Sequence, residues 1–188
     1  INNFLKSFFP AGFYYKTFMW PKSFWYRVYE PFIRKAAGLG VGSTEKDKER
    51  YEHKYEYCDL LVTGSGPSGL ASAYAAAKSG AKVILAEDKP RFGGSLLTDD
   101  VNIENLSGKQ WADKIISELK EMPNVTLKNR SQVFGYYDHN MLVMFERTGD
   151  HLEKKSKYYP RQRWWYIRSK EVILSTGSIE RPIVFGNN

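Results

Sequence analysis

The sequence predicts an α/β fold, and three features near the middle of the chain support this prediction. The first is a short apolar run at 59–63, of the kind that forms a buried parallel strand. The second is an alanine-rich segment at 70–78, which has strong helix propensity and is followed by Gly80 as a natural stop. The third lies between them and is a turn with three glycines: Gly64, Gly66 and Gly69.

A second predicted strand at 81–86 completes a strand–helix–strand unit and ends at Glu87. In such a unit Gly64 allows the tight turn, Gly66 lets a pyrophosphate approach the backbone, and Gly69 lets helix and strand pack closely. This pattern predicts a Rossmann-like FAD/NAD(P)-binding fold, in which free N–H groups and the helix dipole bind an anion. We expect the other residues of the turn to share this site: Ser65, Pro67 and Ser68.

A carboxylate stands where a ribose ligand is expected. Glu87 lies 18 residues after Gly69, close to the spacing of about 20 residues found in dinucleotide-binding units. We therefore assign Glu87 to the adenine ribose, include its neighbour Asp88 in the cofactor site, and assign Gly93 and Gly94 to a second close approach of backbone to ligand. A tight turn without a ligand is the alternative, but strand, turn, helix and acid agree on dinucleotide binding.

Further elements extend the predicted sheet. A capping box at 107–110 begins a helix that ends before Pro123, and a third parallel strand is predicted at 125–128. Two alternating segments, 141–147 and 163–168, fit an antiparallel hairpin on the edge of the sheet. These features indicate an antiparallel addition to the predicted Rossmann-like sheet.

A final apolar strand begins at Glu171 and ends in Thr176 and Gly177. Small residues at this point permit close passage of the backbone beside a ligand. We therefore include Thr176 and Gly177 in the candidate site, while an ordinary strand and turn is the alternative for this segment taken alone.

The sequence predicts three regions. Residues 1–42 form an aromatic N-terminal arm, since 13 of the 29 aromatic residues fall within positions 1–32. Residues 43–57 form a charged linker, and 58–188 form the dinucleotide-binding domain, incomplete at its C-terminus. We expect the arm to pack on the domain or against another subunit, because exposed aromatic surface favours aggregation. A membrane-interface belt is the alternative.

Composition restricts the function further. The net charge is +7, with basic residues dense over 154–170, yet no nucleic-acid-binding pattern accompanies them. A solvated hairpin or a subunit contact explains them better. The single Cys58 excludes an internal disulfide and a C-x-x-C redox pair. The three histidines lack ligand spacing, so no metal site is expected. No stretch has membrane-spanning length, and we expect a cytoplasmic protein.

Four segments resemble the α subunit of heterotetrameric sarcosine oxidases: 10–21, 33–40, 135–138 and 176–182. The aromatic segment 10–21 and the Glu180-Arg181-Pro182 ending are more specific to this family than the glycine turn, which many oxidoreductases share. The resemblance covers nearly the whole chain. It implies a fold of the two-dinucleotide-domain flavoprotein type. It also implies that the chain is an internal fragment of a longer subunit.

The resemblance implies a complex that demethylates sarcosine oxidatively to glycine, hydrogen peroxide and a one-carbon unit that passes to tetrahydrofolate. It implies NAD at the glycine turn, flavin chemistry mainly in another subunit, and no nameable catalytic residue in this chain. Two alternatives stay open. One is an FAD-dependent amine oxidoreductase of the cyanide-forming or opine-oxidising type, and the other is a dinucleotide-binding module without catalysis.

Overall fold

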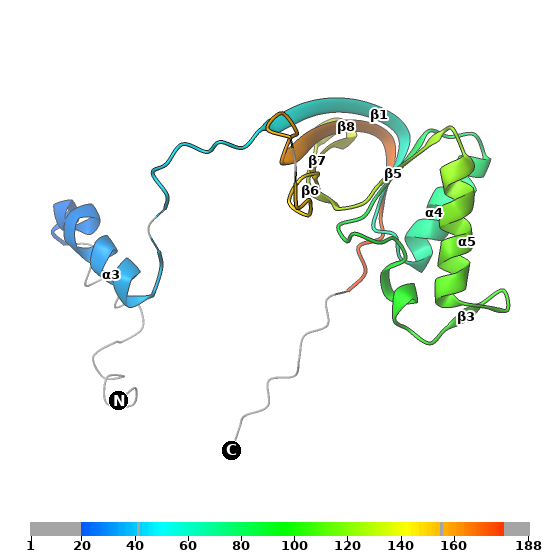
Figure 1. Cartoon of the computed structure of the whole chain (residues 1–188), viewed down its shortest axis with the longest axis horizontal. Helices are drawn as coiled ribbons and strands as arrows, with labels where there is room; N and C mark the ends of the chain where they lie inside the picture. Colours follow the sequence, from blue (N-terminus) through cyan, green and yellow to red (C-terminus); the bar gives the residue numbers. More distant parts are fainter. Residues whose placement is uncertain (1–19, 41, 155, 179–188) are drawn as a thin grey trace, which may run out of the picture. The chain divides into compact units, whose positions relative to one another are not determined.

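The structure, a computed structural model, describes residues 20–40, 42–154 and 156–178. The chain divides by its internal contacts into two units, Ile1–Asp47 and Lys48–Asn188 (Figure 1). The boundary between these units lies inside the segment predicted as a linker, 43–57. The predictions made for residues 1–19 and for 179–188 lie outside the described residues.

The described part of the first unit is helical. It holds three consecutive segments: η2 (Lys22–Phe24), η3 (Trp25–Tyr29) and α3 (Glu30–Ala36). The last of them ends at Ala36, shortly before Gly38, whose φ of 69° suits a glycine after a helix. No helix within the described ranges is long and apolar enough to cross a membrane.

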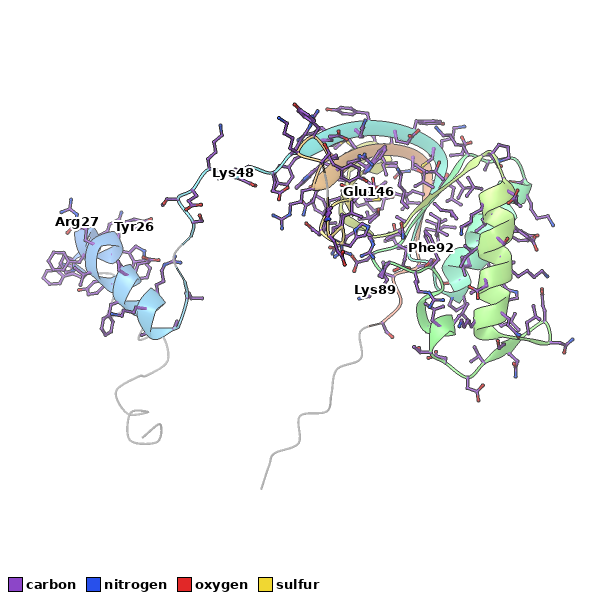
Figure 2. All side chains as sticks on the ribbon, in the orientation of Figure 1. Tyr26, Arg27, Lys48, Lys89, Phe92 and Glu146 are labelled. Carbon is purple, nitrogen blue, oxygen red and sulfur yellow. The ribbon has the colours of Figure 1, made fainter. Side chains whose placement is uncertain are left out.

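Aromatic side chains on this first unit face outward. None of the residues in η2, η3 and α3 is buried, and Trp20, Tyr26 and Phe32 are 80%, 81% and 73% exposed. Figure 2 shows Tyr26 and Arg27 among the side chains around these helices. The described part of the arm therefore has no core of its own.

Within the described residues, the second unit is built on a six-stranded mixed sheet with strand order β5-β2-β1-β8-β7-β6. The elements of this unit are β1 (Tyr51–Thr63), α4 (Pro67–Lys78), β2 (Val83–Ala86), η4 (Gly94–Leu97), β3 (Asn102–Ile103), β4 (Leu106–Ser107), α5 (Gly108–Glu121), β5 (Val125–Lys128), β6 (Ser131–Tyr137), η5 (Asp138–Asn140), β7 (Met141–Arg147) and β8 (Gln162–Leu174).

Strands β5, β2, β1 and β8 are parallel, as predicted for the first three. Helices α4 and α5 lie together on one side of the sheet (Figure 1). The capping box predicted for α5 is present, with the Ser107 side chain bonded to the Gln110 backbone N–H. The core under the helices combines sheet and helix residues: Leu60, Val62, Leu70, Ala73, Val83, Leu85, Trp111, Ile115 and Leu119. The alanines of α4 let it approach the strands closely.

The linker prediction is wrong over 51–57, because β1 begins at Tyr51. These residues pair in parallel with β8. One of their charges is compensated across the two strands, where Arg163 Nε donates to Glu52 Oε2 at 2.9 Å. That hydrogen bond lowers the pKa of Glu52. Glu56 pairs instead with Lys82, just before β2, at 2.7 Å. These charged residues therefore form a strand because β8 pairs with their backbone and nearby cations offset their carboxylates.

The strands predicted at 163–168 and after Glu171 are one continuous strand, β8. Its first half pairs antiparallel with β7, which confirms the predicted pairing of these two segments, and β1 runs beside its whole length. The predicted edge position is wrong, because β6 pairs with the other side of β7 and forms the edge. The two strands arch side by side (Figure 1). In the sequence the strand looks interrupted, because the charged Lys170 lies between the two apolar segments. Its Nζ lies 2.8 Å from Asp59 Oδ1 of β1, so the charge is compensated within the sheet. Strand β6 was not predicted.

Much of the basic cluster at 154–170 has a structural use. Arg161 pairs with Asp150 at 2.7 Å, in addition to the pairs that Arg163 and Lys170 make with β1. Hydrogen bonding from Lys170 lowers the pKa of Asp59. These cations hold strands and loops of the second unit together.

Candidate dinucleotide site

The glycine turn connects β1 to α4 at the carboxyl end of the parallel strands. Gly64 has a φ of 96°, and a Cβ added there would lie 2.2 Å from the carbonyl oxygen of Ser175. A Cβ at Gly69 would lie 1.9 Å from the carbonyl oxygen of Gly64. Both distances are far below van der Waals contact, so neither position accepts a side chain. This geometry agrees with the tight turn and the close packing expected of these two glycines.

Gly66 is different, because a Cβ there would meet no atom within 4 Å. It is the N-cap residue of α4, and Pro67 follows at the start of the helix. The first N–H groups of a helix have no partner inside it, and Pro67 has no N–H, so the amides of Ser68 and Gly69 face the helix end. Open space before a helix N-terminus without side chains is what a pyrophosphate group requires.

Glu87 follows β2, is buried at 8% exposure, and bonds directly to the turn. Its Oε2 accepts from the N–H of Ser65 at 2.9 Å and from Ser65 Oγ at 2.5 Å. Its Oε1 accepts from the N–H of Lys89 at 2.9 Å. These three donors stabilise the carboxylate away from water. Glu87 therefore lies against the glycine turn, as its predicted ribose role requires, and also fastens the turn to the end of β2.

The loop with Gly93 and Gly94 packs against the same turn. The N–H of Gly93 donates to the carbonyl oxygen of Ser65 at 3.1 Å and to Ser65 Oγ at 3.0 Å. A Cβ at Gly94 would lie 2.8 Å from Gly66 Cα. Both glycines have positive φ, 126° and 53°. The structure thus brings together these two predicted residues and the turn.

Asp88 lies next to Glu87 but bonds elsewhere. Its Oδ1 accepts from Arg147 Nη2 at 2.5 Å, and the same guanidinium donates to the Asp88 carbonyl oxygen. Asp88 therefore anchors the loop after β2 to the end of β7. Its carboxylate is engaged by this cation.

The chain passes the turn again at the end of β8, at Ser175. The N–H of Ser175 donates to the carbonyl oxygen of Thr63 at 2.7 Å, and its backbone limits the space at Gly64. Thr176 and Gly177 follow, and a Cβ at Gly177 would meet nothing within 4 Å. Neither Ser175 nor the amide of Lys89 was predicted as part of the site. The small side chain of Ser175 at the end of the strand was the sequence feature that could have indicated its close contact with the turn.

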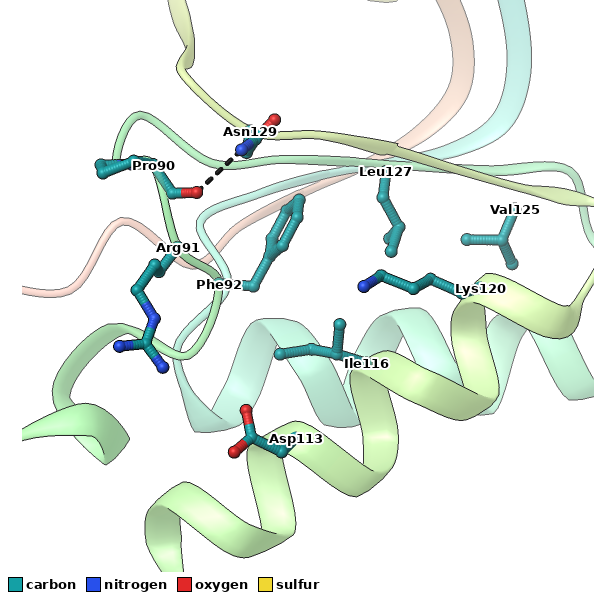
Figure 3. Close-up of a pocket in the computed structure, with 9 residues that line it drawn as sticks. All are labelled: Pro90, Arg91, Phe92, Asp113, Ile116, Lys120, Val125, Leu127 and Asn129. Atoms are coloured by element: carbon teal, nitrogen blue, oxygen red, sulfur yellow. Dashed lines mark hydrogen bonds between the residues drawn. The ribbon is translucent and has the colours of Figure 1, made fainter.

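A groove of about 500 Å³ lies elsewhere, between α5 and β5 (Figure 3). Phe92 lies beside Leu127 of the strand, Ile116 of the helix faces them, and Arg91 and Asp113 lie toward one end. None of the residues predicted for the dinucleotide lines it. The groove and the predicted dinucleotide-binding residues are therefore at different places. The hydrogen bonds around the glycine turn define the candidate site.

Comparison with known proteins gives the chain its relatives. Residues 59–146 match the family described as FAD dependent oxidoreductase. Over all 188 residues the chain is 45% identical to "Sarcosine oxidase subunit alpha" of Rhizobium meliloti (strain 1021). The chain is therefore similar, over its whole length, to one part of a sarcosine oxidase α subunit. The protein of the same name from Corynebacterium sp. (strain U-96) is 40% identical over 154 residues, which are 81% of this chain.

The chain spans 19% of the length of the Rhizobium subunit and 16% of the Corynebacterium subunit. Among solved structures, L-proline dehydrogenase from P. horikoshii superposes with a TM-score of 0.55 at 20% identity, covering 77% of this chain and 27% of that one. At this identity the likeness concerns the fold. The predicted FAD/NAD(P)-binding fold of flavoproteins is confirmed, and so is the resemblance to sarcosine oxidase α subunits.

Proposed function

We propose that this chain is the dinucleotide-binding part of the α subunit of a sarcosine oxidase-type complex. The observation that carries the proposal is the contrast within the turn: Gly64 and Gly69 are closed by backbone, whereas Gly66 opens on free space at the N-terminus of α4. A pyrophosphate requires this combination of a rigid turn and an approachable backbone.

The residues around this opening fit an adenine dinucleotide. The amides of Ser68 and Gly69 would bind the pyrophosphate, and Glu87 would accept a hydrogen bond from the adenine ribose. Gly94, which has no side chain, would leave the space in front of Gly66 open. We propose NAD as the cofactor, which supplies a hydride acceptor when bound. The buried carboxylate of Glu87 supports an unphosphorylated ribose, since a 2′-phosphate beside it would be repelled.

The activity of the whole protein is proposed on the 45% identity to the Rhizobium subunit. That activity is the oxidative demethylation of sarcosine to glycine, with hydrogen peroxide and a one-carbon unit as the other products. Other subunits of a hetero-oligomer are proposed partners, and the cytoplasm is the proposed location. Within this chain no residue is assigned to the chemical step, so its part is to bind and orient the cofactor.

FAD is the second candidate for the same site, and the match of residues 59–146 to FAD dependent oxidoreductases favours it. NAD and FAD both contain an adenosine diphosphate, so the turn serves either. The test is to purify the full-length protein in its complex, release the nucleotides bound to the α subunit, and identify them by mass spectrometry. NAD supports the proposal, and FAD at this site supports the second candidate. If the α subunit holds neither NAD nor FAD, both candidates are overturned.

A further inference from the structure

Ser65 joins three segments of the candidate site through one buried side chain. Its Oγ donates to Glu87 at the end of β2 and accepts from the N–H of Gly93 in the following loop. Its own N–H donates to the same carboxylate oxygen. Ser65 is 0% exposed, so these bonds are shielded from water and each is stronger than at the surface.

The hydrogen bonds of Glu87 leave one acceptor position open. Each carboxylate oxygen accepts about two hydrogen bonds. Among the residues that the structure describes, Oε2 receives both donors of Ser65, the N–H and the hydroxyl, whereas Oε1 receives only the N–H of Lys89. The free position is therefore on Oε1. This open acceptor position requires a hydrogen-bond donor, and a ribose hydroxyl is such a donor.

We propose that Ser65 is a positioning residue, which holds Oε2 of Glu87 so that Oε1 is presented to a hydroxyl of the adenine ribose. This inference rests on the proposed dinucleotide site and deepens it. Ser65 acts through Glu87 and through the Gly93 loop. Without the hydroxyl, Oε2 loses its shortest bond, and the carboxylate is free to rotate away from the ribose.

The test uses the full-length protein freed of nucleotide, with ADP and 2′,3′-dideoxy-ADP as calorimetric probes. ADP is the part that NAD and FAD share, and the dideoxy compound lacks only the ribose hydroxyls. The wild-type protein should bind ADP on the order of tenfold more tightly than dideoxy-ADP, as a hydrogen bond to a charged acceptor predicts. In Ser65→Ala this ratio should fall to about twofold.

Matched variants separate positioning from general damage. Ser65→Thr retains the hydroxyl and should retain the wild-type ratio, so its loss there would overturn the inference even if Ser65→Ala does not fold. Ser79→Ala, at the other end of α4, removes an exposed hydroxyl that bonds to Ala76 and should change nothing. Adding Ser65→Ala to Glu87→Gln should have no further effect on the ratio, since both act on one hydrogen bond.

Two failures are distinguishable. If the wild-type protein does not bind ADP, the proposed function fails and this inference with it. If the wild-type protein distinguishes ADP from dideoxy-ADP and Ser65→Ala does so equally well, the dinucleotide site stands and the positioning role of Ser65 is refuted.

Discussion

Gly69 packs against Gly64 so closely that a Cβ on the first would lie 1.9 Å from the carbonyl oxygen of the second. The start of α4 is thereby pressed onto the end of β1, and the turn cannot open without moving the helix. Gly66, between the two, has no neighbour within 4 Å of a Cβ. One motif thus contains positions that serve the fold and a position that is free to serve a ligand.

This contrast predicts opposite effects of two substitutions. Gly69→Ala should destabilise the second unit by about 2 kcal/mol or more, because its methyl group overlaps backbone that cannot move aside. Gly66→Val should leave the fold largely intact and abolish ADP binding, because the side chain fills the space before the helix. Thermal unfolding and calorimetry measure the two effects. Unchanged ADP affinity in Gly66→Val would contradict the proposed site.

Glu87 should set the preference between phosphorylated and unphosphorylated cofactors. The wild-type protein is expected to bind NAD more tightly than NADP, because the buried carboxylate repels a 2′-phosphate. Glu87→Gln keeps the size of the side chain and should narrow the ratio of the two affinities. An arginine near the ribose would favour a 2′-phosphate, and Arg91 lies only four residues after Glu87. Arg91 lines the groove beside α5 instead, so it should not reverse the preference for NAD. Equal affinities for NAD and NADP in the wild-type protein would exclude Glu87 as the ribose ligand.

Arg147 should restrain the loop after β2. Replacing it with Met removes the bonds to Asp88, and we expect faster hydrogen exchange over 88–94 with little change elsewhere. Arg161→Met is the matched control, since Arg161 pairs with Asp150 in a different loop and its loss should leave 88–94 protected. The same exchange in both variants would show that the Asp88 contact does not restrain the loop.

Cys58 should resist alkylation in the folded protein. It is fully buried, its Sγ lies 3.4 Å from Ser169 Oγ, and burial raises the pKa of its thiol because the thiolate is poorly solvated there. A raised folded-state pKa contributes stability below the unfolded-state pKa, and this is lost as pH rises through the folded value. Iodoacetamide at pH 8 should label the Cys58 peptide only after denaturant is added. Equal labelling with and without denaturant would refute this.

The aromatic arm should make this piece of the chain self-associate when expressed alone. Each covered aromatic side chain buries about 150–250 Å², and Trp20, Tyr26 and Phe32 are exposed in the described part of the arm. Co-expression with partner subunits should restore solubility, because covering apolar surface removes the driving force for aggregation. Sedimentation showing a monodisperse monomer would count against a protein contact, and co-pelleting with liposomes would favour the membrane alternative.

Local patterns in the sequence were enough to predict the parallel half of the sheet. The 59–63 run, the glycine turn, the capping box at 107–110 and the strand at 125–128 all appear as predicted. Each has a local physical cause, such as a glycine that alone tolerates positive φ or a serine that caps a helix. Glu87 was also placed correctly beside the turn, because its spacing reflects the length of one helix and one strand.

Tertiary structure decided the rest. The charged residues of 51–57 read as a linker, and they form a strand because β8 supplies Arg163 opposite Glu52. Likewise β8 is one strand, since β1 continues beside it past Lys170. The bond between Ser65 and Glu87 joins residues 22 positions apart, which no local pattern can reveal. The sequence by itself determined which backbone conformations and turns are possible. Only the folded sheet determined which distant charges and hydroxyls meet, because those contacts depend on strand order and register.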